Sequence, residues 1–181
     1  PMEIFNRVAE FVKAEDTKII QQYVFGGCKY YQEGMNALKK ACGEIRWPVT
    51  WIQGDPCNGE HLTATQIYAI KGNAEPVVFN GKVVGTVYED EDARYCLLGD
   101  LTPDDLNASP GDQTTAVFEK MQAVLQTVGM DFSNVVRTWM YLSDLLEWYD
   151  EFNAARTAFF EKNGVFDRMV PASTGIGVKN P

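Results

Sequence analysis

The chain has 181 residues, of which 45% are hydrophobic and 23% charged, and 16 Lys and Arg against 25 Asp and Glu give a net charge of −9. This composition is typical of a globular protein with its own core, and its negative charge, with no basic cluster, excludes a non-specific nucleic-acid binder. No apolar run approaches the roughly 20 residues of a membrane span, and no signal-peptide pattern opens the chain, so we expect a cytoplasmic protein without a membrane partner.

The first part of the chain alternates helices and strands. Apolar periodicity predicts a helix over 3–14, a strand over 18–25 and a helix over 30–42 that stops at Gly43. Two strands follow, at 48–53 and 63–70. Gly72-Asn73 then marks the expected boundary between two halves.

The second part opens with a hairpin, because Asn80-Gly81 stands between two runs of β-formers. The acidic run 89–92 is interpreted as a solvated turn, since it lacks the ligand spacing of a calcium loop. The remaining predicted elements are a strand at 95–98, a loop at 101–112, a helix ending at Gly129, a strand at 134–142, a helix at 145–162 and an extended segment at 169–178. Asp144 and Glu147 predict a capping-box variant at the last helix, which Asn163-Gly164 closes.

The order of elements indicates the fold class. The second half reads β-β-α-β-α-β and the first α-β-α-β-β, which is the same order without the opening hairpin. The sequence therefore predicts an α+β sandwich with helices packed on one face of a mixed sheet. It also suggests a degenerate internal duplication, with residues 1–72 as the reduced half and 73–181 as the complete domain.

One arginine lies within an apolar helical stripe. At 100° per residue, Arg156 falls between Leu145, Tyr149, Phe152 and Phe159. An unpaired guanidinium is costly to bury, so it requires an anionic partner. That partner is either a carboxylate of the protein, in a structural ion pair, or the carboxylate of a ligand.

The strand before this helix has an unusual outer face. Val135, Arg137, Trp139 and Tyr141 alternate with the apolar residues that would pack on helices. Exposed Trp and Tyr beside Arg indicate either an oligomer interface or a pocket wall.

Small residues dominate the segment Pro171-Ala172-Ser173-Thr174-Gly175-Ile176-Gly177. They permit close approach of a ligand to the backbone, or equally a bend in an edge strand. No phosphate-loop motif is present.

Metal and triad chemistry have little support. His61 is the single histidine, and Cys28, Cys42, Cys57 and Cys96 are irregularly spaced with no CxxC. We therefore expect no metal, no cofactor and no Ser-His-Asp catalytic triad.

Residues 95–177 resemble the RidA/YjgF superfamily. The matching positions are Gly99, Gln113, Gly129, Asp144-Leu145, Asn153, Phe159-Phe160 and Pro171-Ala172. The resemblance implies a chorismate-mutase-like α+β domain that assembles as a homotrimer with pockets between subunits. Ser173 stands where the family's imine deaminases carry an arginine, Gly175 where they often carry a cysteine, and the family's last strand with its glutamate would lie beyond Pro181.

These departures, with the Asn153-x-x-Arg156 pairing, look more like the chorismatase branch. The resemblance implies an inter-subunit or inter-domain pocket for a small carboxylic acid, in a chorismatase-like enzyme working without metal. The alternatives are an enamine/imine deaminase and a non-catalytic binding or regulatory module; the superfamily also carries the labels endoribonuclease L-PSP and translation initiation inhibitor. The expected substrate-binding residues are Arg156, Asn153, Ser173, Thr174, Gly175, Gly99, Trp139, Tyr141 and Arg137.

Overall fold

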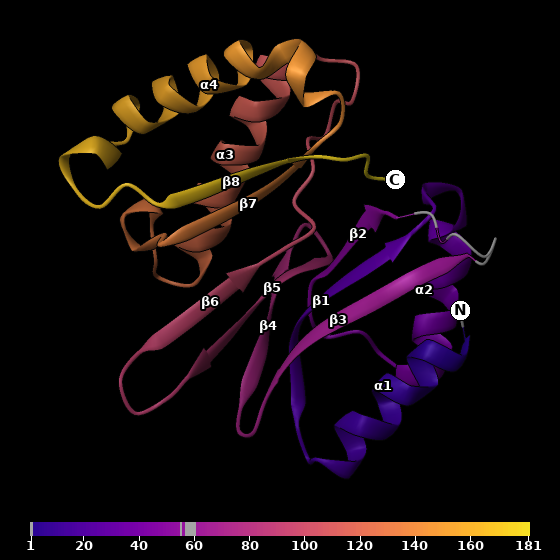
Figure 1. The fold of residues 1–181 in the computed structure, drawn as a ribbon. Coiled ribbons are helices and arrows are strands. Elements are labelled where there is room, and N and C mark those ends of the chain that lie inside the picture. The colour runs from indigo at the N-terminus through magenta and orange to yellow at the C-terminus, as the bar shows by residue number, and fades with distance from the viewer. Residues whose placement is uncertain (1, 55, 57–60) are drawn as a thin grey trace. The chain divides into compact units, whose positions relative to one another are not determined.

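The computed structural model describes residues 2–54, 56 and 61–181. Its elements are helices and short strands, with five strands in succession between the second and third α-helices (Figure 1). They group into two compact units, Pro1–Asp100 with Asn180–Pro181, and Leu101–Lys179. The expected α+β class is confirmed.

The first unit begins with a three-stranded sheet and two helices. The elements are α1 (Met2–Ala14), β1 (Lys18–Gly26), the 3-10 turn η1 (Cys28–Tyr30), α2 (Tyr31–Cys42), β2 (Val49–Gln53) and β3 (Leu62–Ile70). Strand β1 is central, parallel to β2 and antiparallel to β3. The core lies between this sheet and the helices and is formed by Phe5, Val24, Ala37, Leu38, Val49, Trp51 and Leu62. A Cβ at Gly34 would overlap the Trp51 ring, so α2 approaches the sheet this closely only because position 34 is glycine.

A second antiparallel sheet completes the first unit. It has the order β4 (Ala74–Phe79), β5 (Lys82–Glu89) and β6 (Arg94–Leu98). The predicted hairpin is confirmed, with Asn80 at φ 50° and Gly81 at φ 78°, the left-handed conformations that a two-residue turn of this kind requires.

The compact units divide at Asp100, and the domain boundary expected at Gly72-Asn73 stays a prediction. The second sheet belongs to the same unit as β1 and β2. The Gln21 side-chain amide donates to the Leu98 carbonyl at 3.2 Å, and the Asp100 backbone amide donates to Thr50 Oγ1 at 3.2 Å. That residues 1–72 form a degenerate copy of the rest stays a prediction.

The second unit contains two long helices and a parallel strand pair. Its elements are α3 (Pro110–Thr127), η2 (Phe132–Asn134), β7 (Arg137–Leu142), α4 (Leu145–Lys162), η3 (Val165–Asp167) and β8 (Ala172–Gly177). Phe118, Phe132, Phe159 and Phe160 pack their rings together between α3 and α4, at centroid distances of 5.0–6.4 Å. Gly129 at φ 72° follows α3, as predicted.

Two details near β7 differ from the prediction. The strand begins at Arg137 and not at 134, because Asp131 and Asn134 form a reciprocal capping box that winds the preceding residues into η2. The capping box predicted at Asp144 is wrong: Asp144 is left-handed at φ 50° and its side chain caps nothing. Instead the Trp148 indole donates to the Ser143 carbonyl at 2.8 Å, and Trp148 itself is non-helical. The first turn of α4 is thus kinked, and Tyr149 is exposed and not part of a continuous buried stripe.

Candidate functional site

The strand pair β7–β8 divides the predicted site residues between its two faces. The parallel register pairs Thr138 with Ser173 and Trp139 with Thr174. Because side chains alternate along a strand, Arg137, Trp139 and Tyr141 share one face with Thr174. Ser173 and Gly175 lie on the opposite face, which packs towards α4.

Arg137 is the best-defined polar group of the first face. Its Nη2 donates to Thr174 Oγ1 at 3.0 Å, and its Cζ lies 4.3 Å from the centre of the Trp139 ring. Trp139 is 48% exposed. Within the described residues, no carboxylate lies within 4.0 Å of the Arg137 guanidinium. The face therefore presents a cation held in place by stacking and one hydrogen bond, with further N–H donors directed to solvent.

The opposite face is covered at Thr138, whereas Ser173, Gly175 and Gly177 on β8 are exposed. Ser173 Oγ lies 2.9 Å from Thr138 Oγ1, and Thr138 is buried. A Cβ built on Gly175 or Gly177 would lie 3.6 Å or 3.8 Å from Leu145. The small residues of β8 therefore leave room for Leu145 of α4. Ser173 and Gly175 do not join Thr174 in one cluster, because successive side chains point to opposite faces of the strand.

Arg156 lies on α4 with an aromatic partner and no acidic one. Its Cζ is 5.5 Å from the centre of the Phe152 ring, and the side chain is half-buried. No ion pair to Arg156 is found within the described residues, so the structural ion pair considered from the sequence is not observed. No hydrogen bond connects Arg156 or Asn153 to the part of β8 that includes Ser173 and Thr174.

Gly99 lies in the first unit. A Cβ at this position would be 3.1 Å from both Pro48 and Thr50 Oγ1, so the residue fills a narrow gap against β2. Its expected part in closing a ligand pocket stays a prediction.

The family comparison applies to the region that contains these elements. Residues 99–180 match the family described as Endoribonuclease L-PSP. This match supports the RidA/YjgF resemblance for residues 99–180. The match begins at Gly99 and includes α3, β7, α4 and β8, the elements on which the sequence resemblance rests. A comparison with curated proteins gives no match.

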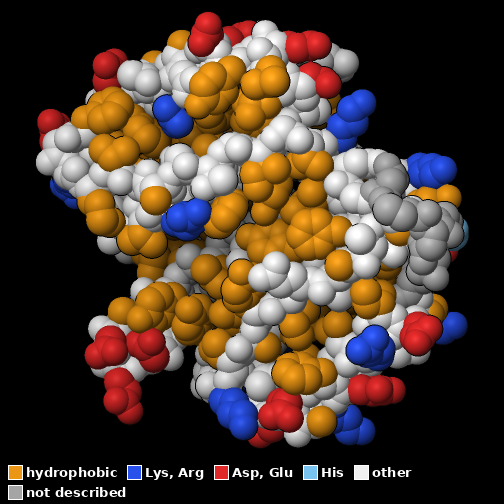
Figure 2. All heavy atoms as spheres, viewed as in Figure 1, with side chains coloured by type: hydrophobic (Ala, Val, Ile, Leu, Met, Phe, Trp, Pro, Cys, Tyr) orange, Lys and Arg blue, Asp and Glu red, His pale blue; other side chains and the backbone are white. Residues whose placement is uncertain are grey.

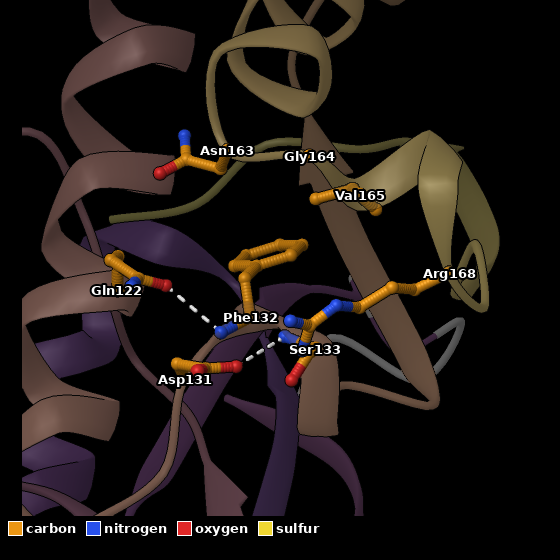
Figure 3. Close-up of a pocket in the computed structure, with 8 residues that line it drawn as sticks. All are labelled: Gln122, Asp131, Phe132, Ser133, Asn163, Gly164, Val165 and Arg168. Atoms are coloured by element: carbon orange, nitrogen blue, oxygen red, sulfur yellow. Dashed lines mark hydrogen bonds between the residues drawn. The ribbon is translucent and has the colours of Figure 1, made fainter.

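The matched region also has a small surface cavity of about 110 Å³ (Figure 3). It is lined by Gln122, Asp131, Phe132, Ser133, Asn163, Gly164, Val165 and Arg168. Two of its polar side chains already have partners: Gln122 accepts from the Phe132 amide at 2.9 Å, and Asp131 accepts from the Ser133 amide at 2.7 Å. Hydrogen bonds from Ser133 hold the pKa of Asp131 below its ordinary value. None of the predicted site residues lines this cavity. The hydrogen bonds of Gln122 and Asp131 hold η2 in place beside it.

Sequence analysis missed a group of ionisable residues in the first unit. Lys82 Nζ lies 2.7 Å from Asp100 Oδ2, and burial raises the pKa of Asp100 above its ordinary value despite this pair. Tyr31 is close enough for burial and the Asp100 charge to raise its pKa as well. No local pattern signals this group, because its members come from α2, the hairpin and the end of β6.

Other site types find no support in the described part of the chain. No three His, Cys, Asp or Glu side chains there come together as metal ligands. None of its helices is both long and apolar enough to cross a membrane. On the face shown in Figure 2, Lys and Arg side chains are scattered among larger hydrophobic areas and form no broad basic patch.

Proposed function

We propose that the RidA/YjgF region binds a small carboxylic acid on the β7–β8 face, with Arg137 as the group that pairs with the carboxylate. The observation that carries this proposal is the position of the Arg137 guanidinium, fixed between the Trp139 ring and Thr174 Oγ1. A guanidinium matches a carboxylate with two parallel hydrogen bonds. Because stacking and Thr174 already restrict the side chain, little further conformational freedom is lost on binding.

Arg137 fits this role better than Arg156, which the sequence favoured. Arg156 is half-buried against Phe152, whereas Arg137 lies on an exposed strand face with a hydroxyl and an aromatic ring beside it. The Trp139 ring can also pack against the apolar part of a small acid. The ligand class is unchanged from the sequence expectation, but the cation that binds it is different.

A second copy of the chain would complete this face. Trp139 is a large apolar side chain that is 48% exposed, and Trp, Tyr and Arg are enriched at the centres of interfaces. We therefore propose that the region assembles as a homotrimer, with the acid bound near the β7–β8 face. Chorismatase-like chemistry, imine deamination and binding without catalysis are the three activities to be distinguished.

The test is titration of chorismate, pyruvate and 2-oxobutyrate by calorimetry into three proteins: the unmodified chain, Arg137→Met and Arg156→Met. Loss of a charge-assisted hydrogen bond, about 1.5–3 kcal/mol, should weaken binding about 10- to 150-fold in Arg137→Met. Arg156→Met is the matched control and should bind nearly normally. The opposite pattern, or equal affinity in all three proteins, would refute Arg137 as the carboxylate ligand.

Activity is measured separately by product formation from chorismate and from a 2-imino acid generated in the assay. We expect poor deamination, because Ser173 cannot pair with a carboxylate as the family arginine does. Turnover of tens per second on the imino acid would show that deamination is the function after all.

A further inference from the structure

At the end of the first unit, Lys82 binds both the side chain and the backbone carbonyl of Asp100. Asp100 is the last residue of that unit before the chain enters the second. Lys82 Nζ lies 2.7 Å from Asp100 Oδ2 and donates to the Asp100 carbonyl at 3.1 Å. The Asp100 amide is also bonded, to Thr50 Oγ1 at 3.2 Å, and φ is +55°. Side chain, amide and carbonyl of Asp100 are thus all fixed to the first unit.

The second unit holds the chain again two residues later. Lys120 in α3 donates to the Thr102 carbonyl at 2.7 Å and to Asp104 Oδ1 at 2.5 Å. The Lys120 side chain is only 16% exposed, so this contact is largely protected from solvent. Further along, Gln113 donates to the carbonyls of Leu106 and Ala108 at 3.1 and 2.9 Å. The loop before α3 is therefore attached to its own unit almost from its first residue.

Only Leu101 lies between these two attachments. Without them, the nine residues 101–109 that precede α3 could extend up to roughly 30 Å. With them, the freedom of the connection is confined to the backbone dihedrals of Leu101 and its two peptide links. Hinges in proteins are a few such terminal residues that absorb the change in φ and ψ.

We propose that Lys82 and Lys120 act as a pair of clamps that reduce one connection between the units, the one that follows Asp100, to a one-residue hinge at Leu101; the chain crosses between the units again after Lys179. The clamps restrict the backbone freedom of this connection, while each unit keeps its own core. The two are not equivalent: the Lys82 side chain is 48% exposed and salt screens it, whereas Lys120 is protected.

The experiment compares Lys82→Gln, Lys120→Gln and the double variant with the control Lys71→Gln, which removes an exposed lysine of the first unit. Thermolysin, which cuts before leucine, is used to measure cleavage at Leu101 and Leu106 by intact mass. Small-angle X-ray scattering of the same samples measures the radius of gyration. Thermal unfolding of each sample verifies that both units remain folded.

Each single variant should be cut in the connection about tenfold faster than the unmodified chain, as expected when a locally closed segment opens. The double variant should be cut faster still and show a larger radius of gyration, while Lys71→Gln stays unchanged. High salt should speed cleavage of the Lys120→Gln variant more than that of Lys82→Gln, because only the Lys82 clamp remains in the former. Equal cleavage in all variants, or an unmodified chain already cut as fast as the double variant, would overturn the proposal.

If Lys120→Gln fails to fold, Asp104→Asn replaces it. The Asp104 side chain is 87% exposed, so this change weakens the Lys120 clamp without disturbing the core. Faster cleavage in Asp104→Asn supports the clamp, and unchanged cleavage contradicts it.

Discussion

The Gly111 amide in the first turn of α3 donates a 2.7 Å hydrogen bond to the Glu151 carboxylate of α4. The two residues are 40 positions apart, so the contact joins the helices of the second unit as well as capping one of them. A negative charge at a helix N-terminus satisfies an unpaired amide and complements the helix dipole. A Cβ at position 111 would lie 2.8 Å from Glu151 Oε1, so the approach depends on glycine.

Glu151→Ala should therefore destabilise the second unit by about 0.5–2 kcal/mol, the usual cost of losing an N-terminal cap. Glu151→Gln keeps an acceptor at the same place and should recover part of that loss. Urea unfolding measured by circular dichroism gives both values. Equal stability in all three proteins would show that water replaces the carboxylate at no cost.

Arg156→Met should leave the free energy of unfolding unchanged or raise it. No carboxylate of the described residues pairs with Arg156, so its removal strands no buried charge there. Breaking a buried ion pair would instead cost about 3–5 kcal/mol and lower Tm by many degrees. Differential scanning calorimetry distinguishes the two outcomes, and a large fall in Tm would reveal an acidic partner that Arg156 acquires in solution.

Thr86→Val should stabilise the first unit. Thr86 is 1% exposed on β5, and its hydroxyl has no hydrogen-bond partner among the residues that the structure describes. Valine has nearly the same shape and removes a polar atom whose burial costs about 1–3 kcal/mol. The expected gain is about 1 kcal/mol in urea unfolding, with Thr86→Ser as the control that keeps the hydroxyl. A loss of stability in Thr86→Val would mean that the hydroxyl has a partner in solution.

Asp131 should make the second unit more stable at neutral than at acidic pH. Hydrogen bonds from Ser133 lower its pKa in the folded state, so the folded protein binds fewer protons than the unfolded chain in the acidic range. The stabilisation is complete above the unfolded pKa of about 3.9 and is lost as pH falls through the folded value. The stability difference between the unmodified chain and Asp131→Asn should therefore shrink between pH 5 and pH 2. Carboxyl NMR titration provides the direct check, and an Asp131 pKa at or above 3.9 would contradict the assignment.

Trp139→Glu should disrupt the proposed trimer. A charge at the centre of a desolvated interface opposes association, whereas the same change on a free surface has little effect. Sedimentation velocity should show trimers of the unmodified chain and monomers of the variant. Monomers in both samples would remove the interface from the proposal.

Features encoded by neighbouring residues were predictable from sequence. Asn80-Gly81 specifies its turn and Gly129 ends its helix because each requirement is satisfied within a few residues. The capping box predicted at Asp144 is wrong because the local motif resembles a cap, whereas the Trp148 indole donates to the Ser143 carbonyl and the start of the helix is kinked.

The candidate site depended on pairings that sequence does not encode locally. The contact between Arg137 and Thr174 exists only because β7 and β8 lie parallel in one particular register, across 37 residues of chain. The alternation within β8 was available from the sequence and would have separated Ser173 from Thr174, had it been applied to that segment. The Lys82–Asp100 pair had no sequence signal, because it joins a hairpin to the end of another strand.

The exposed position of Trp139 gives the protein an optical reporter of its own. Of the four tryptophans, Trp47, Trp51 and Trp148 donate their indole N–H to Gln22, the Gly26 carbonyl and the Ser143 carbonyl. Trp139 instead lies half in water beneath a guanidinium. A bound carboxylate that draws Arg137 towards itself would change the charge beside the Trp139 indole and beside no other tryptophan. The part of the tryptophan fluorescence that an aqueous quencher reaches should therefore report ligand binding without an added dye.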